Sequence, residues 1–143
     1  MTDTVYNYVR QGAYDVIEAL RLANSDDIAQ TGRARPASPG SMPYIYVGDT
    51  RINMEHSSGV RSWEGEQDVV IVDMAFDNED QQARVDGIIS LVINAFSDNP
   101  HFAHDNSVGD PVRTRPAVED FGAGQIYPAV IITIGDLVFK EGR

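Results

Sequence analysis

The sequence has 143 residues, of which 22 are acidic and 11 basic, so its formal net charge at pH 7 is -11. Lys and Arg are too few for bulk binding of nucleic acid or of an anionic membrane, because both depend on clustered positive charge. The lack of cysteine excludes disulfide bonds, thiolate metal sites and cysteine nucleophiles. The length predicts one domain over residues 1–143, which is large enough to bury a core.

The beginning of the chain does not resemble a targeting segment. The first residues, MTDTVYNYVRQ, lack the basic and apolar stretches of a secretion signal. No segment reaches the ~18 consecutive apolar residues that span a membrane. We therefore expect synthesis and residence in a cytoplasm, without membrane contact.

The first predicted element is an amphipathic helix from Val5 to Asn24, in which apolar residues recur with the spacing that lines one helix face. The next residues, 25–42, contain Gly, Pro and Ser without periodicity and predict one long loop. Loops of this length are uncommon in compact domains. We expect this loop either to be flexible in solvent or to become ordered on a neighbouring subunit. Arg33 and Arg35 make its middle basic.

Three strands are predicted in the middle of the chain. Residues 44–47 and 51–55 are separated by the turn residues Gly48 and Asp49, and this pattern is typical of a hairpin. The longest strand signal follows over residues 67–76, with apolar side chains on both faces. We expect Val70, Val72, Met74 and Phe76 on one face, and Val69 and Ile71 on the other.

A second helix is predicted from Asp77 or Asn78, either of which can cap it, to about Phe96. It carries more apolar residues than one buried face requires, because Leu91, Ile93 and Ala95 lie beside or beyond the core stripe. We expect another surface to cover this surplus. The stripe itself consists of Val85, Ile88, Ile89, Val92 and Phe96.

The last two predicted strands complete a sheet. Residues 111–118, PVRTRPAV, alternate between two prolines as an edge strand does, and residues 126–138 are apolar on both faces. The element order favours an α+β fold, a mostly antiparallel sheet with both helices packed on one face. The other face then needs a cover, either a subunit partner or the long loop. We expect that face to carry Val69, Ile71, Tyr127, Ala129 and Ile131.

Catalytic and ligand-binding motifs are weak. His101 and His104 lie near Asp98 and Asp105, but four polar residues of a surface loop are a better interpretation than a metal site. Residues 77–80 lack the glycine and glutamate of a calcium loop, and the GAG motif at 122–124 precedes a strand instead of following one. The sequence contains no nucleophile elbow, phosphate loop or zinc-protease motif. We expect no enzyme activity, cofactor or metal.

Three further side chains are candidates for contact with a partner. Trp63 is the single tryptophan, and it is either an interface anchor or a core residue. Arg113 and Arg115 leave one face of the predicted edge strand. They either protect that edge or pair with the acidic surface of a neighbour.

Four segments together resemble the tail terminator, or tail completion, proteins of long-tailed bacteriophages. They are the amphipathic N-terminal helix, the loop ending in SMPYIYVGD, the strand QDVVIVDMAF passing into DNEDQQARVDGIISLVINAF, and the closing strand IYPAVIITIGDL. The resemblance covers most of the chain and rests on this pattern. It implies a small α+β sandwich that forms a hexameric ring on the last ring of the tail tube, stops its polymerisation and offers a surface to the head connector. Such proteins are not enzymes.

The resemblance implies partners and a location. The partners would be other copies of the chain, the major tail tube protein and the head–tail connector protein, and the location would be the virion tail. DNA would pass through the ring without specific binding. A head-closure or neck connector protein is the alternative in the same class. A small α+β ligand-binding or enzymatic dimer is the alternative in another class, and it requires a deep pocket with His101, His104 or buried carboxylates.

A ring contact between copies needs two different patches on each subunit. The candidates are the surplus apolar side of the second helix, with Leu91 and Ile93, and the outer sheet face with Arg113 and Arg115. The loop 25–42 is a candidate docking arm that would become ordered on binding.

Negative charge is concentrated in two segments. Residues 64–86 hold eight acids against Arg84, a balance of -7, and residues 97–110 hold three acids and no Lys or Arg. We expect these segments to form a localised acidic surface that faces the ring lumen or a basic patch on a partner. The three acids of the second segment are Asp98, Asp105 and Asp110.

Overall fold

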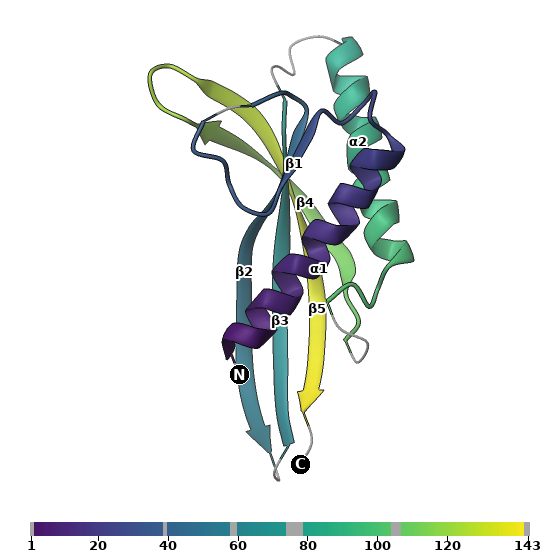
Figure 1. Cartoon of the computed structure of the whole chain (residues 1–143), viewed down its shortest axis with the longest axis vertical. Coiled ribbons are helices and arrows are strands. Elements are labelled where there is room, and N and C mark those ends of the chain that lie inside the picture. The colour runs from purple at the N-terminus through teal and green to yellow at the C-terminus, as the bar shows by residue number, and fades with distance from the viewer. Residues whose placement is uncertain (1, 39, 58–59, 74–78, 104–106, 142–143) are drawn as a thin grey trace.

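The computed structural model describes residues 2–38, 40–57, 60–73, 79–103 and 107–141 (Figure 1). Within them lie two helices and a five-stranded sheet of order β1-β2-β3-β5-β4, antiparallel except for the pairing of β1 with β2. The predicted α+β fold is confirmed, and β4 lies at a sheet edge as expected. In chain order the elements are α1 (Thr2–Ala23), β1 (Gln30–Gly32), β2 (Tyr44–Ser57), β3 (Val60–Val72), α2 (Glu79–Asp98), β4 (Asp110–Asp120) and β5 (Ile126–Glu141).

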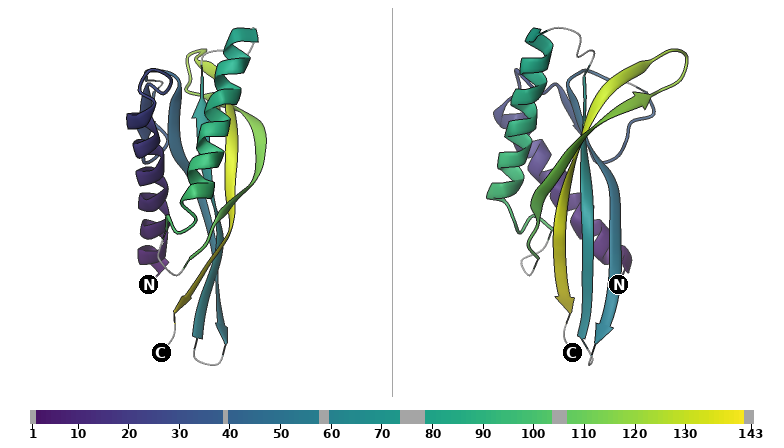
Figure 2. Two further views of the ribbon diagram at one scale, coloured as in Figure 1. Left: turned by 90° about the vertical axis from the view of Figure 1, so that its right-hand side faces the viewer. Right: turned by 180° about the vertical axis from the view of Figure 1, so that it is seen from behind.

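Both helices pack on one face of the sheet, as the side view in Figure 2 shows. In each helix the apolar residues recur every three or four positions, and this spacing brings them to the face that meets the sheet. Gly12 lets α1 approach the loop after α2, because a Cβ there would lie 1.9 Å from the carbonyl oxygen of Phe102. The buried residues are Val5, Val9, Ala13 and Ile17 in α1, and Val85, Ile88, Val92 and Phe96 in α2.

The hairpin predicted at Gly48 and Asp49 is wrong. Residues 44–57 form one strand, β2, which pairs with β3 along its whole length and shifts register between Val47 and Thr50. The fully buried side chain of Gln67 donates from Nε2 to the carbonyl oxygens of Gly48 and Asp49, at 3.1 and 3.3 Å. These carbonyl groups therefore have a hydrogen-bond partner although the chain does not reverse direction here. Gly and Asp are typical of turns, but an irregularity within a strand accommodates the same residue types.

The predicted faces of β3 are reversed. Val69 and Ile71 lie opposite Ile132 and Val130 of β5, and they belong to the core under the helices. Val70 lies opposite Ile131, and directly opposed antiparallel residues share a face of the sheet. Both residues belong to the apolar cluster on the second face, which is turned away from the helices. Tyr127, Ala129 and Ile131 lie on that second face as predicted. The strand begins at Val60 and ends at Val72, whereas the predicted Met74 and Phe76 and the caps Asp77 and Asn78 lie outside the described residues.

The segment predicted as the loop 25–42 contains the short strand β1 and the fully buried Ile28. Beyond β1 it covers part of the second sheet face from within the same chain, where Met42 packs on an apolar cluster. Arg35 donates from Nε to Glu119 at 2.7 Å and from Nη2 to the Asp120 carbonyl at 2.8 Å, and its guanidinium lies 4.8 Å from the Phe121 ring centroid. The segment is thus fastened to the β4–β5 hairpin beside it in Figure 1.

Candidate functional site

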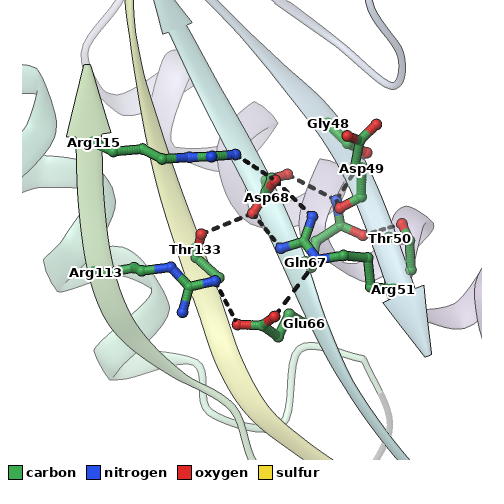
Figure 3. A network of polar contacts seen from close by, with 10 residues as sticks. All are labelled: Gly48, Asp49, Thr50, Arg51, Glu66, Gln67, Asp68, Arg113, Arg115 and Thr133. Atoms are coloured by element: carbon green, nitrogen blue, oxygen red, sulfur yellow. Dashed lines mark hydrogen bonds and ion pairs between the residues drawn. The ribbon is translucent and has the colours of Figure 1, made fainter. Parts of the chain in front are cut away.

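Three arginines and two acids form a polar network across the second sheet face (Figure 3). Arg51 comes from β2, Glu66 and Asp68 from β3, and Arg113 and Arg115 from β4, the edge strand. The arginines of β4 reach over β5 to the acids of β3, and Figure 3 shows all five side chains converging. We call Arg51, Arg113 and Arg115 the arginine stripe.

Asp68 is the centre of this network. Its side chain is 3% exposed and accepts two hydrogen bonds of 2.9 Å from the guanidinium of Arg51 and one of 2.8 Å from the hydroxyl of Thr133. Burial raises the pKa of the Asp68 carboxyl, but the hydrogen bonds from Arg51 and Thr133 favour the charged form and outweigh it. The net result is a pKa below the ordinary value. Asp68 is therefore an ionised acceptor at neutral pH and not a proton donor.

Within the network the arginines outnumber the carboxylates. Arg113 pairs with Glu66 at 2.9 Å, Arg51 also lies 3.5 Å from Glu66, and Arg115 lies 3.8 Å from Asp68. Three guanidiniums thus share two carboxylates. The arginine side chains remain 42% to 56% exposed. On a chain with a net charge of -11, these exposed guanidiniums are a local concentration of basic side chains, and the acids Glu64 and Asp136 line the same hollow as Arg51 and Arg113.

A second surface feature lies on the opposite side of the molecule, between α1 and α2. It is a groove of about 580 Å³ with half-buried apolar side chains in its interior and exposed carboxylates along it. Leu91, part of the predicted surplus of α2, lines this groove. We call this feature the acidic groove and define it by Asp15, Val16, Leu20, Leu91, Ala95 and Asp98.

The structure separates the remaining apolar candidates. Trp63 is 2% exposed and packs with Val5, Val9 and Leu137 under α1, so the core interpretation is confirmed and the interface anchor is wrong. Its indole N–H has no hydrogen-bond partner among the described residues. Ile93 is half-buried against the main core, so it does not join Leu91 in the groove.

The basic candidates have partners within the chain. Arg33 donates to Asn7 of α1, and Arg35 is held by the β4–β5 hairpin as described above. Arg113 and Arg115, expected to guard the edge or to pair with a neighbour, contact acids of β3. Both arginines are still more than half exposed, so they keep surface available to another molecule.

Among the described residues, the acids of the two segments differ in burial. Asp68 and Asp73 of the first segment are buried and paired with arginine, Asp73 with Arg84 at 2.6 Å. In the second segment Asp98 and Asp110 are exposed, whereas Asp105 lies outside the described residues. Counting charges along the sequence shows where acids are concentrated. It does not show which of them are exposed and which are buried beside a cation.

The residues considered for a metal site are only partly described. His101 Nδ1 lies 2.6 Å from the carbonyl oxygen of Ser107, and His104 and Asp105 lie outside the described ranges. Among the residues that the structure describes, no three His, Asp or Glu side chains group in a way that would hold a metal ion. None of the helices in this described part is both long and apolar enough for a membrane span.

Sequence reasoning missed Arg51, Glu66 and Asp68 in the network, and Asp15 in the groove. Arg51 and Asp68 come together only because β2 shifts register beside them. Asp68 gives a usable signal, because it directly precedes the apolar run at residues 69–72, and a charged residue that is buried beside such a run needs an opposite charge next to it. A search against protein-family models finds no match to the chain, and no curated protein matches it.

Proposed function

We propose that the protein is a structural component of a phage virion, a terminator that forms a ring on the end of the tail tube, stops its polymerisation and presents a surface for head joining. The observation that carries the proposal is the presence of two different surfaces on opposite faces of one small α+β unit, the arginine stripe and the acidic groove. A contact between unlike patches propagates in one direction and closes into a ring when the rotation per copy allows it.

The described architecture supports the proposal in a second way. The resemblance to tail terminators implies a small α+β sandwich, and the chain has two helices on one face of a five-stranded sheet. By the same resemblance we expect six copies in the ring. The net charge of -11 suits a ring through which DNA passes, because a negative wall repels phosphates and does not retain them.

The test is an assembly assay on the full chain, alone and with tail tubes grown from a major tail tube protein. Light scattering over a range of concentrations gives the oligomer mass, and negative-stain microscopy shows the particle shape. We expect rings, alone or at tube ends, and tubes that stop growing when the protein is added. An unrelated acidic protein of similar size serves as the control.

Two results would change the assignment. A strict monomer or dimer that neither caps nor shortens tubes would overturn the proposal. Rings that ignore tail tubes and bind a head connector would contradict the terminator assignment and favour a neck protein of the same structural class.

A further inference from the structure

We propose that neighbouring copies contact one another through these two surfaces, so that the arginine stripe of one copy binds the acidic groove of the next. Arg113 and Arg115 then pair with Asp15 and Asp98 across the contact. This inference rests on the proposed ring function and adds to it the identity of the contact and the partner of each surface, a second copy of this chain.

The first support is the way in which the arginines use their donors. Each guanidinium offers five N–H groups, yet three guanidiniums share only two carboxylates. Arg115 lies 3.8 Å from Asp68, which is too long for a hydrogen bond. Ion pairs between exposed side chains contribute little to stability, so Arg113 and Arg115 can engage further carboxylates at little cost.

The second support is the state of the acids on the other face. Acids in several other places have an arginine within ion-pair distance, as Glu18, Asp73 and Glu119 do. Among the side chains that the structure describes, none of the ion pairs involves Asp15 or Asp98. The Asp15 carboxylate accepts a 2.8 Å hydrogen bond from the side-chain amide of Gln11, which carries no charge. The groove therefore presents negative charge with no described cation beside it.

The third support is the chemistry of the groove. Its interior is apolar, through Leu20, Leu91 and Ala95, and its carboxylates are exposed. An arginine side chain has the same division, with an apolar stem and a charged head. A stem that lies on the leucines brings its guanidinium to the level of Asp15 or Asp98. Arginine is also the cation best suited to pair with carboxylates at an interface.

The placement of the two surfaces fixes the type of contact. Arg115 lies opposite Ile131, which belongs to the apolar cluster of the second sheet face, whereas the acidic groove lies between the helices on the first face. Figure 2 shows these faces on opposite sides of the molecule. One copy therefore cannot satisfy its own groove, and two copies cannot satisfy both pairs of surfaces by a two-fold axis. The contact runs from head to tail.

Charge reversal tests this contact. The groove variant carries Asp15→Arg and Asp98→Arg, and the stripe variant carries Arg113→Glu and Arg115→Glu. Each variant opposes like charges in every contact, and we expect a loss of about 100-fold or more in the association constant by light scattering and ultracentrifugation. The matched control, Asp86→Arg, adds a positive charge at an exposed position of α2 that does not line the groove. It should assemble like the wild type.

Mixing the two variants should restore rings. An intact groove then meets an intact stripe at one contact, and a reversed groove meets a reversed stripe at the next. A chain that carries all four substitutions should assemble by itself for the same reason. Because Arg113→Glu and Arg115→Glu also face Glu66 and Asp68, thermal unfolding of each variant is measured in parallel, and Arg113→Gln with Arg115→Gln provides a milder stripe variant.

The outcomes separate this inference from the proposed function. A folded groove variant that forms rings at wild-type concentrations would overturn the contact and leave the ring function standing. If both variants fail to assemble and do not recover on mixing, the proposed contact would also be overturned, because complementary charges would then not hold the copies together. A wild-type chain that forms no ring, alone or on tubes, would overturn the proposed function itself.

Discussion

Replacing Asp68 by alanine should destabilise the fold more than the loss of any single exposed acid. Its side chain is 3% exposed and accepts two hydrogen bonds from Arg51 and one from Thr133, whose side chain is buried. Truncation leaves the Thr133 hydroxyl without this acceptor, which costs about 1–3 kcal/mol. Arg51 is 42% exposed and keeps Glu66, so water offsets most of its loss. The remaining loss of the Arg51 hydrogen bonds adds about 1 kcal/mol, so we expect a decrease of about 2–4 kcal/mol in the free energy of unfolding.

Urea unfolding, followed by circular dichroism and by the fluorescence of the buried Trp63, measures this change. Asp68→Asn keeps an acceptor for Thr133 and loses only the charge, so it should cost about half as much. Glu64→Ala, at an exposed position of the same strand, is the control and should stay within about 0.5 kcal/mol of the wild type. If Asp68→Ala unfolds at the wild-type urea concentration, the reasoning on the network is refuted.

Three further predictions follow from single contacts. Folding lowers the pKa of Asp68, so its contribution to the free energy of unfolding is complete above the unfolded pKa of about 3.9 and is lost as the pH falls through the folded pKa. Acid titration should therefore show a steeper loss of stability in the wild type than in Asp68→Asn. Equal slopes would contradict this. Trp63→Phe should cost less than about 1.5 kcal/mol because the indole N–H has no described partner, whereas Trp63→Ala should cost about 3–5 kcal/mol in urea unfolding. Gly12→Ala should lower the melting temperature despite its better helix propensity, since its Cβ meets the Phe102 carbonyl; a rise would refute that close approach.

The parts of the fold that sequence could predict are those with a one-sided pattern. Both helices carry an apolar stripe against a polar face, and the buried residues of α2, Val85, Ile88, Val92 and Phe96, all belong to the predicted stripe. The edge strand β4 alternates and contains Pro111 and Pro116, which a central strand excludes. For these elements the local sequence pattern and the tertiary environment favour the same secondary structure and the same buried face.

Prediction failed where two solutions share one local pattern. Gly48 and Asp49 suit a turn, but the buried amide of Gln67, distant in sequence, satisfies their carbonyl groups within a continuous strand. In β3 both faces are apolar, so alternation alone does not say which face meets the helices; the pairing of Val69 with Ile132 decides it. The site shows the same limit, because Asp15 and Asp98 line one groove only after two helices pack.

Site-specific crosslinking tests the head-to-tail contact most directly, because the chain has no native cysteine. A variant with Arg115→Cys and Asp98→Cys places one thiol on each face, and a short bis-maleimide then joins only surfaces that meet between copies. We expect a ladder of covalent multimers up to the size of the ring. Each single-cysteine variant, and the pair Arg115→Cys with Asp86→Cys, should yield essentially monomers. A double variant that assembles into rings and remains monomeric on denaturing gels, or a single variant that crosslinks to dimers as readily, would contradict the proposed contact.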